Sequence, residues 1–219
     1  MDFLLIVPVL LFSVVVHEVA HAWQALREGD PTARDLGRIT LNPLPHLDLM
    51  GSIVVPVVLH LLPGDFLFGW AKPVPVNPRN YRDYRAGDIR VSLAGIVSNL
   101  GLVAVCAALL ALMAAFGVAA PTDGSTFGSL TSSIVLMLTY GVFINLILAY
   151  FNLIPIPPLD GSHVLYHLLP PELGVRYRSM GRYGITLLFF TLVLFPGAFA
   201  VALSPVFLAF QWILRATVG

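Results

Sequence analysis

Three side chains that could bind a metal or activate water lie within five residues near the start of the chain. His17 and His21 are four residues apart, and Glu18 follows the first of them, in the sequence HEVAH. On a helix, side chains with this spacing share one face, about 6 Å apart along the axis, so both imidazoles can reach one ion. A carboxylate beside them can accept a proton from metal-bound water. The pattern predicts a Zn²⁺ site suited to hydrolysis, with His17 and His21 as ligands.

Such a site needs a third protein ligand, because a catalytic zinc has three protein ligands and one open position for water. The candidate is Asp160, which follows the prolines of the sequence NLIPIPPLDG at 152–161. Prolines end an apolar helix here and leave backbone carbonyls that only protein or water can satisfy. Alternatively, Asp160 could cap a helix over 161–169, as an Asp-Gly after prolines often does. Taken alone, the residue types leave both roles open.

The composition places these groups in a membrane protein. Of the 219 residues, 58% are hydrophobic and 11% are charged, whereas soluble domains average about 25% charged residues. Twelve Lys and Arg balance twelve Asp and Glu, so the net charge points to no nucleic-acid partner. An ionisable group in a spanning helix costs about 2.5–3.5 kcal/mol on insertion and marks function by default. HEVAH in an apolar stretch is therefore hard to explain without a role.

Stretches of about 20 apolar residues predict the spanning helices. They lie at 3–26, 91–117, 130–154 and 185–214. Prolines interrupt the last of these, so one kinked span and a span followed by an interfacial helix both fit. The apolar stretch 51–62 is too short to span, and with 66–76 it predicts a re-entrant or interfacial β-hairpin.

These elements predict an all-α polytopic membrane protein with about four to five transmembrane helices and a small β-hairpin. We expect one domain over 1–219, with a catalytic core at about 3–169 and a C-terminal membrane segment at 185–214. If 51–62 does not cross, the eleven basic residues of segments 27–90 and 155–184 all lie on one side. The positive-inside rule makes that side cytoplasmic. The ends of the first and third spans then face the cytoplasm together, which would bring Asp160 towards the two histidines.

With these motifs, the sequence resembles the site-2 protease family of intramembrane zinc metalloproteases. HEVAH matches the family's HExxH, and the 152–161 sequence matches its Asn-to-Asp-Gly motif. Weaker matches lie at Asn42-Pro43, His46-Leu-Asp48, Gly51, 68–77, and Gly95 with Asn99. The resemblance implies that His17, His21 and Asp160 hold zinc and that Glu18 is the catalytic base. The chain leaves no length for the PDZ or CBS domain of many members, so a minimal form is expected.

Supporting residues have alternative roles. Asn152 could donate a hydrogen bond to the oxyanion of the reaction, or it could cap the broken end of its helix. His46 and Asp48 could orient a ligand imidazole, although we expect them to be a solvated loop pair. The stretch 79–90 is expected to be solvated near anionic headgroups.

The predicted reaction is hydrolysis of a peptide bond within or next to a transmembrane segment of a membrane-protein or peptide substrate. The expected partners are that substrate and the lipid bilayer, and no nucleic acid. The expected location is a prokaryotic plasma membrane, with the site towards the cytoplasm. Metal transport is an alternative, but it needs polar residues on a path to both faces. A scaffold with a structural zinc would need four ligands and leave Glu18 without a role.

Overall fold

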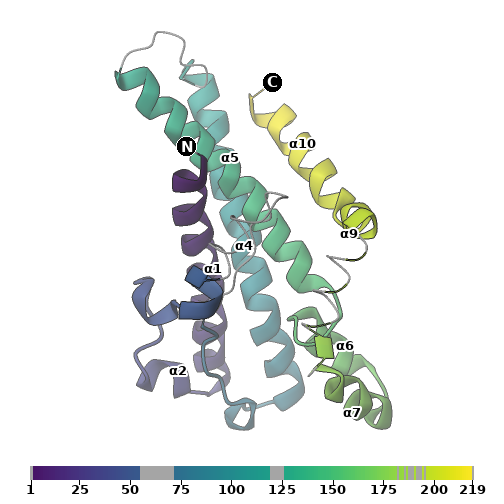
Figure 1. The fold of residues 1–219 in the computed structure, drawn as a ribbon. Helices are drawn as coiled ribbons and strands as arrows, with labels where there is room; N and C mark the ends of the chain where they lie inside the picture. Colours follow the sequence, from purple (N-terminus) through teal and green to yellow (C-terminus); the bar gives the residue numbers. More distant parts are fainter. Residues whose placement is uncertain are drawn as a thin grey trace. The chain divides into compact units, whose positions relative to one another are not determined.

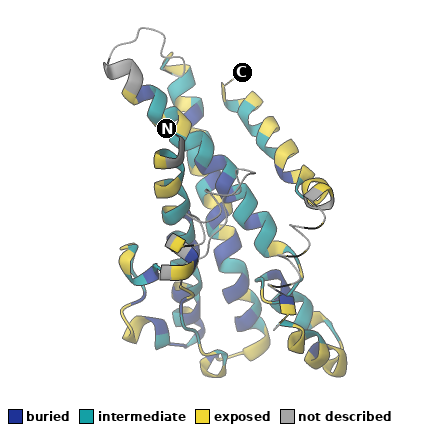
Figure 2. Cartoon of the chain, in the orientation of Figure 1, coloured by how far each residue is buried: buried dark blue, intermediate teal, exposed yellow. Residues whose placement is uncertain are grey.

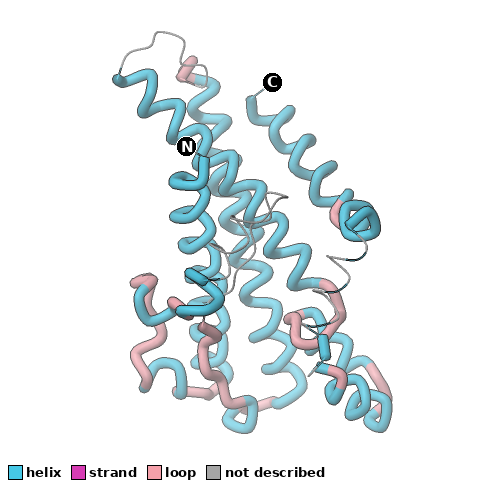
Figure 3. The backbone as a smooth tube through the Cα atoms, viewed as in Figure 1, coloured by secondary structure: helices cyan, strands magenta, loops and turns pink. Residues whose placement is uncertain are grey.

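The structure is a computed structural model of the whole chain. It describes residues 2–54, 72–118 and 126–218, without 182, 185, 187–189, 191–193 and 195. Every regular element in this described part is a helix (Figures 1 and 3). The long ones are α1 (Asp2–Glu28), α4 (Tyr84–Ala115) and α5 (Thr126–Leu153), followed by α6 (Gly161–Leu168), α7 (Pro171–Ser179), α9 (Pro196–Ala202) and α10 (Ser204–Val218). Shorter elements are α2 (Thr32–Asp35), η1 (Leu44–His46), η2 (Leu49–Val54) and η3 (Pro78–Asn80).

Three of the described helices are long and apolar enough to cross a membrane: Leu4–Glu28, Tyr84–Ala115 and Leu130–Leu153. They confirm the first three predicted spans. Many of their large apolar side chains are exposed, as Figure 2 shows, and Val97, Val105 and Leu112 of α4 are each more than half exposed. Lipid-facing side chains need no protein cover, so this pattern fits an integral membrane protein.

The C-terminal segment differs from a single long span. Helix α9 ends at Ala202 and α10 begins at Ser204, directly before Pro205. Proline is tolerated in the first turn of a helix but cannot continue one, so the break falls there. Helix α10 has 15 residues, or about 22 Å, which is shorter than a hydrocarbon core of about 30 Å. The described part thus has three candidate spans, fewer than the four to five predicted.

The predicted β-hairpin over 51–76 is wrong for the residues that the structure describes. Residues 49–54 form the π-helix η2, and 72–77 belong to no strand or helix. The rest, 55–71, lies outside the described residues. A strand needs a neighbouring strand for its N–H groups, but two N–H groups of 72–74 bond to the His46 carbonyl and the Glu18 carboxylate instead.

The chain divides into two compact units: the HEVAH unit, Leu11–Gly95, and the C-terminal unit, Met1–Leu10 with Ile96–Gly219. In the C-terminal unit, Val103 and Leu110 of α4 are buried against Val142 of α5. Phe210 of α10 packs onto the same cluster and lies 5.1 Å from Phe143, measured between ring centroids. This core fixes α4, α5 and α10 within that unit.

In the HEVAH unit, the second half of α1 packs against the first half of α4. Ala25 and Val91 form a buried cluster with Tyr81. One turn further along α1, Glu28 accepts two hydrogen bonds from the Arg90 guanidinium, at 2.7 Å each. Such bidentate pairs fix orientation as well as distance. Tyr81 and Asp88 are buried, so the solvated stretch predicted at 79–90 is wrong at these two positions. The side chain of Arg90 is 52% exposed although it bonds to Glu28, as predicted for this stretch.

Asp30 anchors the chain that follows α1. It is fully buried and accepts hydrogen bonds from the Asn77 N–H at 2.6 Å, the Asn80 side chain at 2.8 Å, and the N–H and hydroxyl of Thr32. Burial by itself raises the pKa of Asp30, but these hydrogen bonds outweigh burial and hold the pKa below its ordinary value. The ionised carboxylate therefore stabilises this loop.

Asp30→Asn is expected to lower the stability of the metal-free protein in detergent by about 1–3 kcal/mol at pH 7. The NH₂ group of the asparagine would face N–H donors that now bond to the carboxylate, so at least one of these donors would lose its acceptor. Since the folded-state pKa is lowered, the contribution of Asp30 is fully present above about pH 4 and is lost as pH falls through the folded value. Thermal unfolding at pH 7 and pH 3 should show a smaller difference between the variant and wild type in acid. Asp35→Asn, at an exposed ion pair with Arg34, is the control and should change little.

Candidate metal centre

His17 and His21 point their Nε2 atoms at each other from one face of α1. The two nitrogens are 2.9 Å apart, and the rings meet edge to face with centroids 4.5 Å apart. His17 is buried. The four-residue spacing and the regular helix through this segment place both rings on one face, as the sequence predicts.

The ring of His21 is oriented by the main chain of α4. Its Nδ1 lies 2.7 Å from the carbonyl oxygen of Val91. Since a carbonyl only accepts, Nδ1 carries the proton and donates it, which leaves the lone pair on Nε2. This is the usual support of a metal-binding histidine, in which the second ring nitrogen donates to a carbonyl or carboxylate.

Gly95, one helical turn after Val91, makes room for both rings. A Cβ at this position would lie 2.5 Å from Cε1 of His17 and 2.5 Å from Nε2 of His21. Real Cβ contacts are essentially never below 3.0 Å. The absence of a side chain at Gly95 is therefore what lets α4 approach the histidine pair.

Glu18 is held on the neighbouring face of α1. Its Oε2 accepts a hydrogen bond from the Val74 N–H at 2.7 Å. This bond fixes one carboxylate oxygen and with it the position of the Glu18 side chain. The carboxylate thus has a defined position beside the histidine pair rather than a solvated one.

Residues 72–76, which supply this N–H, are themselves anchored. The N–H of Lys72 donates to the His46 carbonyl at 2.8 Å, and the Arg38 guanidinium donates to the Lys72 carbonyl at 2.9 Å. The side chain of Val74 packs against Ala22 of α1. Helix α1 and the 38–46 loop therefore hold these residues in place against Glu18.

His46 is not the solvated loop residue that we predict from the sequence. It is fully buried, and its Nε2 donates to the Thr40 carbonyl at 3.0 Å. The returning chain contacts His46 directly, because the Lys72 N–H donates to the His46 carbonyl. Asp48, in contrast, makes a local turn by accepting the Gly51 N–H at 2.7 Å.

Asp160 and Asn152 belong to the C-terminal unit. Asp160 precedes α6 at the N-cap position, but its side chain accepts no cap hydrogen bond, which removes the main support for the capping alternative. Gly161 follows because a Cβ there would overlap the Leu153 carbonyl oxygen. The amide of Asn152 donates to the Leu148 carbonyl at 3.0 Å, as expected if it stabilises the end of α5. Its role at an oxyanion, and that of Asp160 as third ligand, stay predictions.

The histidine pair fits a zinc ion in donor type and in spacing. Two nitrogens at 2.0–2.1 Å from one tetrahedral zinc stand about 3.3 Å apart, and the Nε2 atoms here are 2.9 Å apart. A small outward shift of the rings would admit the ion between them. With neutral imidazoles the pair suits zinc, for which histidine nitrogen is a preferred ligand.

Sequence reasoning misses the groups that orient these side chains. The Val91 carbonyl and the Val74 N–H are main-chain atoms that every residue type offers, so no sequence signal marks them. Gly95 is visible as a small residue in an apolar helix, but only the structure shows that it faces the two imidazoles.

Apolar spanning helices, with a paired-histidine site and a carboxylate beside it, define a class: the metalloproteases embedded in membranes. Residues 76–195, which include Asp160 but begin after HEVAH, match Peptidase family M50. The "Putative zinc metalloprotease YwhC" of Bacillus subtilis (strain 168) is 38% identical over 179 residues, which cover 82% of this chain and 75% of that protein.

Two mycobacterial proteins, each named "Putative zinc metalloprotease Rip2", are similar over 170 residues. The protein of Mycolicibacterium smegmatis is 32% identical and that of Mycobacterium tuberculosis (strain H37Rv) 30% identical, and in both the match covers 78% of this chain and 59% of the relative. No solved structure matches the chain significantly. The chain belongs to peptidase family M50, the site-2 protease family, and is thus a zinc metalloprotease by family.

Proposed function

We propose that the chain hydrolyses peptide bonds within or next to transmembrane segments of membrane-protein substrates, using a zinc ion held by His17, His21 and Asp160. The observation that carries this proposal is the placement of HEVAH inside an apolar helix, Leu4–Glu28, that is long enough to span a membrane. A protease with its ligands on such a helix must meet its substrate at membrane depth.

Each residue has a separate task in this reaction. When bound, zinc would polarise the scissile carbonyl and lower the pKa of water towards about 7. Glu18 accepts the proton of the attacking water on Oε1 and returns it to the leaving amine, while the Val74 N–H keeps Oε2 in place. The Val91 carbonyl holds His21 in the tautomer with its lone pair on Nε2.

We further propose that the site opens towards the cytoplasm of a prokaryotic cell. His17 and His21 lie about 10–16 Å of helix rise before Glu28, the end of α1. The basic residues that follow α1, from Arg34 to Arg90, would place this end on the cytoplasmic side.

The test uses the purified chain in proteoliposomes, with a single-span peptide labelled at both ends as substrate. One bound zinc per chain is expected, with product masses that place the cut inside the apolar stretch or a few residues from it. Removal of zinc with a chelator should stop cleavage, and added zinc should restore it. A soluble peptide with the same scissile sequence is the matched control. Cleavage of the soluble peptide alone would overturn the intramembrane assignment.

A further inference from the structure

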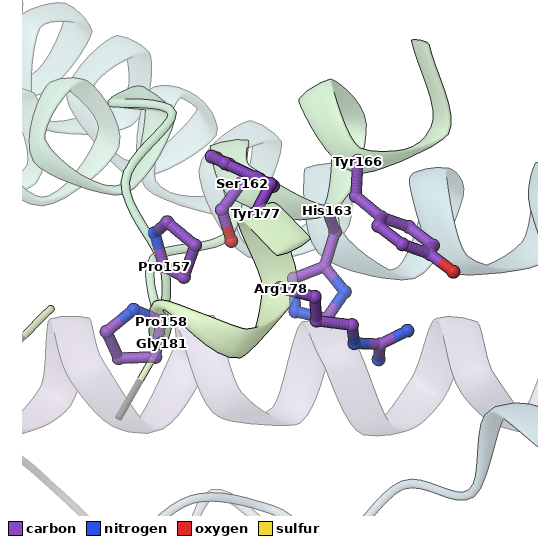
Figure 4. A pocket seen from close by; sticks show the side chains of 8 residues that line it. All are labelled: Pro157, Pro158, Ser162, His163, Tyr166, Tyr177, Arg178 and Gly181. Carbon is purple, nitrogen blue, oxygen red and sulfur yellow. The ribbon is translucent and has the colours of Figure 1, made fainter. Parts of the chain in front are cut away.

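The C-terminal unit contains a cavity between α6 and α7, just beyond the end of α5. Its volume is about 160 Å³. Figure 4 shows Pro157 and Pro158 on one side of it and His163 and Arg178 on the other. A single water needs only about 10–15 Å³ by a comparable measure, so the cavity has room for a small polar group of several atoms.

The polar groups that line the cavity suit an anion. Arg178 and His163 supply N–H donors, and the described lining includes no carboxylate. The guanidinium carbon of Arg178 lies 4.9 Å from the centroid of the Tyr166 ring. This cation–π contact holds the guanidinium beside the cavity, where its N–H donors can serve a ligand. Planar guanidinium donors match phosphate oxygens particularly well.

The walls of the cavity are held by contacts within the same unit. The Tyr177 hydroxyl donates to the Pro155 carbonyl at 2.8 Å and ties α7 to the proline-rich stretch. Gly174 lets α7 approach α6 closely, since a Cβ there would be only 3.2 Å from the Tyr166 ring. The cavity is therefore preformed.

The surroundings of the cavity fit the boundary between lipid headgroups and acyl chains. The third candidate span ends at Leu153, so α6 and α7 follow where a headgroup layer would lie. Several large apolar side chains here are strongly exposed. Leu168, Leu173 and Val175 of the two helices and Met180, directly after α7, are 51–67% exposed. Exposed apolar groups next to Arg176 and Arg178 are typical of an element that lies in the membrane interface.

We propose that this cavity binds the phosphate-bearing headgroup of an anionic phospholipid. The donors of Arg178 and His163 would bind the phosphate, and the exposed apolar residues of α6 and α7 would contact the acyl chains beside it. A free phosphate ion could use the donors but would gain nothing from the apolar rim. The inference concerns lipid binding and does not depend on the proposed protease reaction.

Native mass spectrometry and thermal unfolding of the purified chain in a neutral detergent test this site. Phosphatidylglycerol should bind and raise the unfolding temperature more than phosphatidylcholine or inorganic phosphate at the same concentration. Arg178→Gln is expected to weaken phosphatidylglycerol binding about five- to tenfold, and His163→Gln, a second and smaller change, should weaken it as well. Arg176→Gln, on the same helix but outside the lining, is the matched control and should bind nearly as wild type does.

Two results would overturn the proposal. Equal loss in the Arg176 and Arg178 variants would indicate diffuse charge attraction rather than a site. An equal effect of inorganic phosphate would indicate a free-anion site without a lipid. Circular dichroism and bound zinc, measured on every variant, show that lost binding does not reflect misfolding, and His163→Gln decides the matter if Arg178→Gln does not fold.

Discussion

Glu18→Gln is expected to lower peptide cleavage by about 10²–10⁴-fold, the usual contribution of a general base, while the protein keeps its zinc. Glutamine has the shape of glutamate, and its side-chain oxygen can still accept the Val74 N–H that now bonds Oε2 at 2.7 Å. The remaining amide cannot take up a proton. The change therefore removes proton transfer with little effect on the position of the side chain.

The measurement is the single-turnover cleavage rate of a single-span peptide, together with zinc content by mass spectrometry. Asp160→Asn provides the contrast, because loss of the proposed third ligand should lower zinc content and cleavage together. Added zinc should partly restore the Asp160 variant but leave the Glu18 variant inactive. Cleavage by Glu18→Gln at more than about a tenth of the wild-type rate would show that Glu18 is not the general base.

The helices that carry this site could be predicted because length and hydropathy are local properties of the chain. A helix of about twenty apolar residues would expose a large apolar surface to water, so a membrane is the stable environment for 91–117 and 130–154. The structure confirms these two stretches as helices α4 and α5, both long and apolar enough to span. HEVAH could be predicted for a similar reason, since the spacing of His17 and His21 on a helix by itself puts both rings on one face.

The β-hairpin could not be predicted reliably because a β-branched apolar stretch fits either a strand or a buried helix. Which one forms depends on the partners of its backbone groups. At 72–74 those partners are Glu18 and the His46 carbonyl, and both lie far away in the sequence. The contact of the His46 carbonyl has the same origin, because its donor, the Lys72 N–H, also lies far away in the sequence.

The conformation of Asp160 illustrates what structure adds to a motif. An Asp before Gly161 after several prolines satisfies the rules for a helix cap as well as those for a ligand. The sequence cannot separate these roles, because both use the same carboxylate. In the structure the Asp160 side chain makes no cap hydrogen bond at α6, which argues against the capping role. The role as a ligand is tested by zinc binding.

Gly95→Ala is expected to weaken zinc binding by about 10–100-fold, as changes in the support of metal ligands typically do, and to lower cleavage in proportion at limiting zinc. The added methyl group would lie 2.5 Å from ring atoms of both His17 and His21. Since these contacts are too short, one or both imidazoles must turn away or α4 must move, which also strains the bond from His21 to the Val91 carbonyl. Either movement separates the two Nε2 atoms from a common ion.

Gly101→Ala is the matched control, because it makes the same exchange in the same helix at a position where a Cβ meets nothing within 4 Å. Any effect of alanine on the helix itself is shared by the two variants, so their difference measures the contact with the histidines. Competition with a zinc-chelating dye gives the affinities. Gly95→Ala should regain cleavage when zinc is raised, which Glu18→Gln should not, because the first defect lies in holding the metal and the second in moving a proton. Wild-type zinc affinity in Gly95→Ala would mean that the rings accept the methyl group without moving, and that Gly95 does not position them.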